Sequence, residues 1–518
     1  EAKKEEKAIK IDFAGIEDRM EILPVKAGNL GQLTAVDGKL IFMRYPNRGE
    51  RNGKATLNYY DFKSRKTKKI IEGVNGYDVT ADGKSIMVLK GRDAGIIKIA
   101  ENQKLNKKVD FSNMNMNINP REEWHQIFRE VWRLERDYFY DKNMHGVDWN
   151  KMYKVYSPLI DQCVTRYDVN FVIGQLLGEM NASHTYKGGG DQEYSPSKRI
   201  GCLGINWAKD GDLYKVAHIV KPASWETEVK SPLIQSGIEI EEGDYIFAVN
   251  GKNLSDFNNP YEAFLNLAGK TVELLYGKEK DISKSKTALV KTLSSETRLR
   301  NLEWIEKHRK RVEEATNGRV GYIYVPSTGL DGQRELARQF YGQWNKDALI
   351  IDERWNNGGQ IPDRFIELLN RKPLNYVASR AGKLWQVPRK ANFGPKVMLI
   401  NGWSGSGGDA FPDYFKKTKL GELIGTRTWG GLIGISGAPR LIDGGYITVP
   451  TFRLMDPDGK WFREGYGVDP DIEVNEDPTL MAKGIDPQLE TAIDVLNKKL
   501  KNIKSLHPKR PPREDRSK

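Results

Sequence analysis

The first 110 residues carry short alternating runs of hydrophobic and polar positions separated by turn residues. Two similar units stand about 45 positions apart, Ala-Val-Asp-Gly-Lys at 35–39 and Thr-Ala-Asp-Gly-Lys at 80–84. Asp-Gly before an alternating run is typical of a tight turn that enters a strand, and the period fits four-stranded propeller blades. Two blades cannot close a propeller, since closure takes about four. We therefore expect partial β-propeller strands over 1–112, with an ordinary β-meander as the alternative.

After residue 119 the hydrophobic pattern changes to a helical period. Apolar residues recur every three or four positions with charges between them, which predicts amphipathic helices. Asp168 is expected to be the N-cap of the third helix. The helical domain is predicted to span 113–192. Its helices are predicted at 122–140, 148–156 and 168–180.

Strand patterns return between 197 and 292. A glycine-containing loop at 201–204 precedes a strand, and the run Gly-Asp-Tyr-Ile-Phe-Ala-Val-Asn-Gly at 243–251 ends in a tight turn. This stretch resembles a PDZ domain, with predicted bounds 193–295. A loop of this kind presents backbone N–H groups to a peptide C-terminus. The resemblance implies a peptide-binding loop, although a spacer role stays open; the loop residues are Gly201, Cys202, Leu203 and Gly204.

From residue 318 strand and helix patterns alternate, which indicates an α/β domain. A charged helix at 299–311 precedes it. The domain is predicted over 296–500, and a basic, disordered tail over 501–518. Its strands are predicted at 320–325, 348–352, 396–400, 421–425 and 446–449, and its helices at 331–344, 363–369 and 406–417.

Composition excludes several classes of function. The net charge of +12 is spread among 70 acidic residues, and no basic stripe is interleaved with stacking aromatics, so nucleic-acid binding is not expected. The cysteines, Cys163 and Cys202, have no CxxC partner, so neither a metal site nor a cofactor is predicted. No apolar run approaches about 20 residues, which argues against a membrane span. The chain does not begin with Met, so we expect a truncated or processed N-terminus, and both the cytoplasm and the periplasm stay open.

A hydrophobic strand runs into Asn-Gly-Trp-Ser-Gly-Ser-Gly-Gly-Asp at 401–409 and then into a helix. This order exposes Ser406 at a helix N-terminus, where unpaired N–H groups favour a developing oxyanion. Alone, such a turn is more often an N-cap or a phosphate cradle. A second Gly-Gly turn follows strand 348–352, at the sheet edge where ligands bind in open α/β sheets. We expect the oxyanion donors to be Gly407, Gly359 and Gly358.

Together the two turns resemble the S41 peptidases, which comprise the carboxyl-terminal processing proteases and the tricorn proteases. The family's nucleophile segment is Asn-x-x-Ser-x-Ser-x-x-acid, in which the second serine attacks. The resemblance implies that Ser406 is the nucleophile and that Asp409 is the acid. The family's Asp-x-Arg-x-Asn-x-Gly-Gly turn is matched by Asp352, Arg354, Asn356, Gly358 and Gly359.

The two branches of this family differ in the general base. Processing proteases use a lysine in Thr-x-Gly-Lys-Gly, but the matching run at 425–431 holds a glycine in its place. Histidine is the best base near neutral pH. Tricorn proteases carry a Ser-His pair in their helical domain and a late glutamate, matched by Ser183, His184 and Glu464. The resemblance implies that His184 is the base, that Ser183 orients it, and that Glu464 accepts a bond from the Ser183 hydroxyl.

The order of the predicted segments also resembles a tricorn protease. The fold class is multidomain α+β: partial β-propeller strands, a helical domain, a PDZ-like domain and an α/β peptidase domain. The resemblance implies a serine endopeptidase or oligopeptidase that acts on oligopeptides or unfolded polypeptides within a homo-oligomer, a hexamer. A catalytically inactive peptide-binding scaffold and another acyl hydrolase, such as an esterase, stay open. Side-chain specificity is not predicted, because no acid that would select basic residues can be located.

Overall fold

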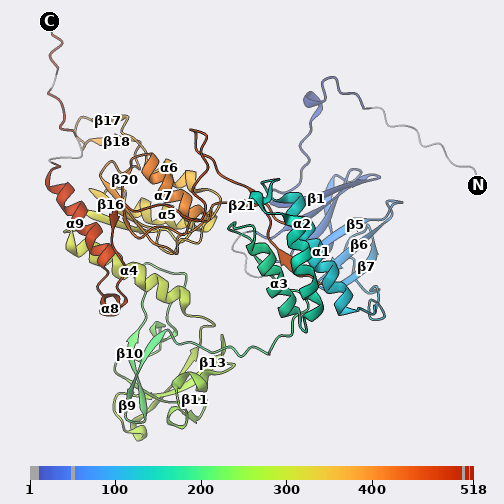
Figure 1. Cartoon of the computed structure of the whole chain (residues 1–518), viewed down its shortest axis with the longest axis horizontal. Helices are drawn as coiled ribbons and strands as arrows, with labels where there is room; N and C mark the ends of the chain where they lie inside the picture. Colours follow the sequence, from blue (N-terminus) through green and yellow to red (C-terminus); the bar gives the residue numbers. More distant parts are fainter. Residues whose placement is uncertain (1–10, 48–52, 504–507, 513, 518) are drawn as a thin grey trace, which may run out of the picture. The chain divides into compact units, whose positions relative to one another are not determined.

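The computed structural model describes residues 11–47, 53–503, 508–512 and 514–517 (Figure 1). The chain divides into two compact units, Glu1–Ile118 and Asn119–Lys518. Among the described residues, no helix is long and apolar enough to cross a bilayer.

The first unit consists of two antiparallel sheets, one of four strands and one of three, each in chain order. The repeated Asp-Gly pairs form the turns that open the two sheets, with positive φ at Gly38 and Gly83. Both sheets contribute to one hydrophobic core. The strands are β1 (Asn29–Val36), β2 (Lys39–Tyr45), β3 (Thr56–Asp61), β4 (Lys66–Glu72), β5 (Gly76–Val79), β6 (Ser85–Lys90) and β7 (Asp93–Lys98).

The second unit begins with three helices, α1 (Pro120–Tyr138), α2 (Trp149–Tyr156) and α3 (Arg166–Gly178). The expectation that Asp168 caps α3 is wrong. The N-cap is Thr165, and Asp168 completes a capping box by accepting the Thr165 backbone N–H at 2.8 Å. The Thr-x-x-acid spacing is the signal for such a box, and it places the helix start three residues earlier.

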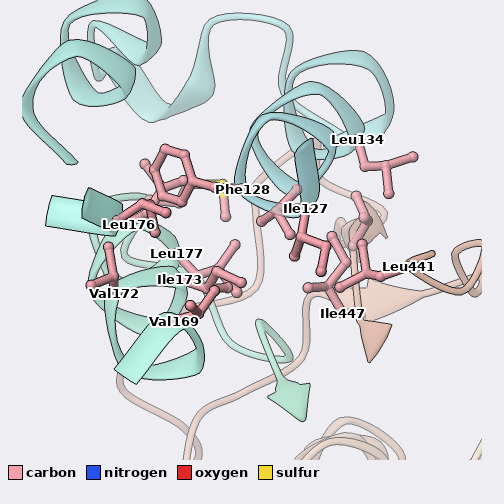
Figure 2. Packing of buried hydrophobic residues seen from close by; sticks show 14 of the residues in the cluster. Ile127, Phe128, Leu134, Val169, Val172, Ile173, Leu176, Leu177, Leu441 and Ile447 are labelled. Atoms are coloured by element: carbon pink, nitrogen blue, oxygen red, sulfur yellow. The ribbon is translucent and has the colours of Figure 1, made fainter. Parts of the chain in front are cut away.

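The core of this helical part includes residues from much later in the chain. Leu441 and Ile447 pack against α1 and α3 (Figure 2). Strand β22 (Tyr446–Ile447) pairs with β8 (Lys187–Gly188), which follows the helices. The prediction that 446–449 belongs to the α/β sheet is therefore wrong. Its short apolar pattern is that of any buried strand, and the pattern does not say which sheet the strand joins.

A buried ion pair joins the same two segments. Arg166 Nε lies 2.6 Å from Asp443 Oδ2, and both side chains are about 1% exposed. Arg166 also donates to Asn170 Oδ1 at 2.6 Å. Because a buried charge without its partner is costly, this pair fixes how the 441–449 segment lies on the helices.

The PDZ-like part is an antiparallel sheet in the order β14-β13-β11-β10-β9, with β12 paired to β11. Its buried residues form a separate core. The strands are β9 (Ile205–Asp210), β10 (Leu213–Ile219), β11 (Tyr245–Val249), β12 (Lys252–Asn253), β13 (Thr271–Gly277) and β14 (Lys286–Lys291).

The last part is a parallel five-stranded sheet in the order β15-β16-β19-β20-β24, covered on both faces by helices. Val397 and Leu399 of the central strand share a core with α4 and α9, whereas Met398 and Ile400 face the core of α5, α6 and α7. The strands are β15 (Val320–Tyr324), β16 (Ala348–Asp352), β19 (Lys396–Ile400), β20 (Gly421–Gly425) and β24 (Ile472–Glu473). The helices are α4 (Thr297–Ala315), α5 (Leu330–Gln343), α6 (Pro362–Leu369), α7 (Gly407–Lys417) and α9 (Pro487–Lys501).

Strands β16 and β19 are neighbours, with Asp352 opposite Leu399. The loops that follow them therefore leave the same edge of the sheet, as parallel strands require. Short elements complete the domain: β17 (Asn375–Val377), β18 (Trp385–Val387), β21 (Gly434–Ile435), β23 (Pro450–Phe452) and α8 (Pro478–Met481).

Candidate active site

Ser406 occupies the N-cap of α7 with an unusual backbone conformation, φ 58° and ψ −118°. A non-glycine residue in such a region costs about 1–3 kcal/mol, and strain of this kind clusters at functional sites. The Ser406 N–H donates to Asp409 Oδ2 at 2.8 Å. Asp409 also accepts the N–H groups of Gly430 and Gly431, at 2.7 and 3.0 Å. Burial raises the pKa of Asp409 to about 6.

The two serines of the turn lie in different surroundings. Ser404 is fully buried, and its hydroxyl donates to the Glu353 carbonyl at 2.9 Å. Ser406 instead lines a pocket of about 400 Å³. Only the second serine is therefore placed where a substrate can reach it.

The two glycine turns interlock. The Gly405 N–H donates to the Asn356 carbonyl at 3.0 Å. A Cβ added to Gly358 would lie 2.8 Å from Ser406 Cβ, and one added to Gly407 would lie 2.8 Å from the Gly359 nitrogen. Any side chain at these glycines would push the turns apart, so the motif needs glycine there.

The three predicted oxyanion donors differ in their hydrogen bonds. The Gly358 N–H already donates to Asn356 Oδ1 at 2.9 Å. Within the described residues, the N–H groups of Gly359 and Gly407 donate to no protein atom. The N–H groups of Gly359 and Gly407 thus have no competing protein acceptor, whereas the expectation for Gly358 does not fit its geometry.

His184 lines the same pocket as Ser406. Its Nδ1 lies 2.9 Å from Ser183 Oγ, and its carbonyl accepts a hydrogen bond from Thr448 Oγ1. With Nδ1 bonded to Ser183, Nε2 is the nitrogen left for proton transfer. Burial lowers the pKa of His184, and the nearby Glu464 charge raises it in part. The imidazole is therefore neutral, and able to accept a proton, at neutral pH.

Glu464 accepts three backbone N–H groups. Oε1 accepts that of Ser183 at 3.0 Å, and Oε2 accepts those of Leu432 and Ile433 at 2.9 and 3.1 Å. Glu464 thus bonds the Ser183 amide instead of the Ser183 hydroxyl that we expected. The carboxylate therefore links the segment that carries Ser183 and His184 to the loop between β20 and β21.

No lysine can replace His184 from the position used by processing proteases. A Cβ added to Gly430 would lie 2.5 Å from the Gly467 nitrogen, and one added to Gly431 would lie 2.2 Å from the Trp429 ring. Among the described residues, no lysine lines the pocket. A side chain at either glycine would require the loop to move.

The charged residues of the turn that follows β16 are buried, and their role is structural. Arg354 Nη2 lies 2.6 Å from Asp352 Oδ2, Nη1 lies 2.8 Å from Asp486, and Arg354 is not exposed. The Tyr322 hydroxyl donates to Asp352 at 2.8 Å. These buried ion pairs stabilise the turn from the protein interior. None of these charged side chains lines the pocket. In the described part of the chain, no group of three or more His, Cys, Asp or Glu residues is placed to hold a metal ion.

Sequence reasoning missed three aromatic residues that line the pocket, Tyr186, Trp403 and Trp429. The rings of Tyr186 and Trp429 lie 5.8 and 5.9 Å from that of His184, both edge to face. A signal was present, because both tryptophans stand inside or beside glycine-rich turns, where a large apolar residue has no core to fill.

In the predicted peptide-binding loop of the PDZ-like part, two of the four backbone N–H groups already donate to protein carbonyls. The Gly201 N–H donates to the Phe264 carbonyl at 3.0 Å, and the Cys202 N–H donates to the Leu293 carbonyl at 2.9 Å. The Leu203 side chain is buried, and Gly204 has φ +65°. In the described structure only the last two of the four loop residues keep an N–H without a protein acceptor.

Three family models match successive parts of the chain. The Tricorn protease C1 domain matches 120–178, the Tricorn protease PDZ domain matches 201–295, and Peptidase family S41 matches 319–474. Ser183, His184 and the 201–204 loop lie at or just beyond the edges of these matches, whereas Ser406 and Glu464 lie inside the third.

Proteins similar to this chain are known from several organisms. The tricorn protease of Thermoplasma volcanium is 31% identical over 497 residues, which cover 95% of this chain and 48% of that protein. A putative tricorn-like protease C-terminal subunit of Sulfurisphaera tokodaii is 34% identical, over 95% of this chain and 58% of that protein. The chain thus spans about half the length of these relatives.

A solved structure gives the same assignment for the fold. The crystal structure of the tricorn protease superposes with a TM-score of 0.83 at 31% identity, over 92% of this chain and 47% of that one. This chain belongs to the tricorn protease family.

Proposed function

We propose that this chain is a serine peptidase that hydrolyses oligopeptides or unfolded polypeptides through an acyl-enzyme on Ser406. One observation carries the proposal: Ser406 and His184 come from distant segments and line a single pocket. The strained backbone of Ser406 supports the same role, because a turn of this kind projects the hydroxyl outward.

In this proposal His184 Nε2 takes the proton of Ser406 as Oγ attacks the peptide carbonyl. The N–H groups of Gly407 and Gly359 stabilise the oxyanion, since these two glycines pack against each other beside Ser406 and neither N–H has a protein acceptor among the described residues. His184 then gives the proton to the leaving amine, and a water attacks the acyl-enzyme with His184 again as base. Ser183 holds Nδ1, so the imidazole keeps one tautomer.

The test compares the two serines of the same turn. Ser406→Ala should remove peptide hydrolysis, whereas Ser404→Ala should keep most of it, because the Ser404 hydroxyl faces the protein interior. Both variants should remain folded by circular dichroism. Loss in Ser404→Ala alone would contradict the assignment. A folded wild-type chain that binds peptides without cleaving them would support the inactive scaffold, and turnover of esters alone would support an esterase.

We further propose that the chain assembles with copies of itself and that the 201–204 loop receives a peptide carboxylate. The resemblance to tricorn proteases supports the first part. The N–H groups of Leu203 and Gly204 support the second. Light scattering at several concentrations tests assembly, with the mass of one chain as the contradicting result. Anisotropy of a peptide with a free or amidated C-terminus tests the loop, and equal binding of both would contradict it.

A further inference from the structure

The pocket beside the candidate nucleophile has a wall of exposed aromatic rings. Trp403, Tyr186 and Trp429 line it and are 73%, 47% and 46% exposed. Single exposed apolar residues are ordinary, but a cluster of large rings in one hollow marks a binding surface. At about 400 Å³ the pocket is in the range that holds small organic groups.

The position of Trp429 is fixed by the nucleophile turn. The backbone N–H of Trp429 donates to the Ser404 carbonyl at 2.9 Å. A Cβ added to Gly405 would lie 2.6 Å from the Trp429 ring, so the ring rests against the turn. The Trp403 backbone N–H donates to Asn401 Oδ1 at 3.2 Å, which places this residue at the start of the turn. The Trp429 ring is therefore preorganised next to Ser406, whereas the Trp403 ring projects into solvent at the rim of the pocket.

The pocket offers no charged partner. No Asp, Glu, Lys or Arg among the described residues lines it. The carboxylates of Asp409 and Glu464 lie close by in the fold, but each accepts three backbone N–H groups. A lysine or arginine side chain would lose water here without gaining an ion pair. An apolar or aromatic side chain would gain from burial and from edge-to-face contacts with the rings.

We propose that this pocket selects substrates with a large apolar or aromatic residue next to the scissile bond, and that Trp403 and Trp429 determine the preference. The proposal rests on the proposed peptidase function. It assigns the substrate class from the uncharged, ring-lined surface around Ser406 and His184.

The experiment uses the whole chain and a set of peptides that differ at one residue. Each position around the bond carries Phe, Leu, Trp, Lys, Arg or Asp in turn, and mass spectrometry maps the cleaved bond. We expect kcat/KM at least tenfold higher for Phe or Leu than for Lys or Arg at one position that flanks the bond. Equal rates, or a preference for Lys or Arg, would overturn the inference.

Variants of the exposed ring separate pocket selectivity from a general loss of activity. Trp403→Ala should reduce the preference for Phe over Lys, and Trp403→Glu should move the preference toward Lys and Arg by tenfold or more. Trp225→Ala is the matched control, since Trp225 is 59% exposed and does not line this pocket. Unchanged selectivity in both Trp403 variants would overturn the role of the ring. Absence of all hydrolysis, with Ser406 unreactive toward a fluorophosphonate, would overturn the proposed function itself.

Discussion

The nucleophile turn and the base segment are held in different ways. The Ser406 N–H is bonded by a neighbour, Asp409, three residues later, and the turn around it packs on the Gly-Gly turn of the adjacent strand. His184 is fixed by distant residues, since Thr448 bonds its carbonyl and Glu464 bonds the adjacent Ser183 amide across 281 positions of sequence. The nucleophile turn thus depends on contacts within the α/β part, whereas the position of the base depends on residues more than 260 positions away in sequence.

Loss of the base should give the largest effect after loss of the nucleophile. His184→Ala is expected to lower kcat roughly 10³- to 10⁴-fold, because no other base lines the pocket in the described structure. Steady-state hydrolysis of a peptide measures this. His125→Ala is the matched control, since His125 is an exposed residue of α1 that pairs with Asp161. Equal rates for His184→Ala and wild type would remove His184 from the mechanism.

Glu464→Gln tests the long-range support of the base. The amide keeps one acceptor oxygen but cannot accept all three N–H groups, so we expect kcat to fall roughly 10- to 100-fold. Glu279→Gln, at an exposed glutamate of another part, serves as the control.

The same variant has a pH signature. A base works in its neutral form, and burial holds the pKa of His184 below its usual 6.5. The acid limb of kcat/KM should therefore lie below pH 6.5. Because the Glu464 charge raises that pKa, Glu464→Gln should move the limb to still lower pH. A limb that moves to higher pH would contradict the placement of the charge near the imidazole.

Loss of the buried ion pair between Arg166 and Asp443 should affect stability more than the rate of hydrolysis. Asp443→Ala leaves the Arg166 guanidinium buried without its carboxylate, which we expect to cost about 3–5 kcal/mol of unfolding free energy. kcat should fall less than tenfold, since Asp443 does not line the pocket. Urea titration and peptide hydrolysis measure the two effects. Asp137→Ala removes an exposed partner of Arg136 and should change neither. A stable Asp443→Ala variant would show that the pair does not anchor the segment.

Substitution of Glu135 should have the smallest effect on kcat, but it should change how the free energy of unfolding depends on pH. It is fully buried in α1, and within the described structure neither carboxyl oxygen has a hydrogen-bond partner. Burial raises the pKa of Glu135 to about 8. A raised pKa in the folded state means that the contribution of this group to stability is complete below the unfolded pKa of about 4.5 and is lost as pH rises toward 8.

Glu135→Gln should remove that dependence. Relative to wild type, the variant should gain about 1.4 kcal/mol of unfolding free energy for each pH unit between about 5 and 8, with kcat unchanged. Glu130→Gln, at a more exposed position of the same helix, should give no such gain. A pH-independent difference between Glu135→Gln and wild type would contradict a protonated Glu135.

Local patterns predicted the parts of the site that depend on neighbouring residues. The strand–turn–helix around Ser406 and the Gly-Gly turn at 358–359 were read correctly as elements, because glycine positions and hydrophobic runs are visible in sequence. Two failures concern partners that only the fold supplies. Strand 446–449 joined β8 instead of the α/β sheet, and Glu464 bonded an amide instead of a hydroxyl.

The sequence also does not show which backbone N–H groups and buried charges are already hydrogen-bonded within the fold. The sequence shows that Gly358 and Gly359 are both glycines, but it does not show that Asn356 takes the first N–H and leaves the second. Likewise the sequence does not show that Arg354 of the Asp-x-Arg turn is buried and paired with Asp352 and Asp486. Satisfaction of buried polar groups decides such roles, and it depends on contacts across the whole domain.

Reaction of the native chain with a fluorophosphonate, followed by mapping of the adduct by mass spectrometry, tests the central claim most directly. We predict one adduct on Ser406, none in Ser406→Ala, and labelling slowed by orders of magnitude in His184→Ala, because the hydroxyl needs the base to become nucleophilic. An adduct on Ser404, or labelling of Ser406 at the same rate without His184, would contradict the account.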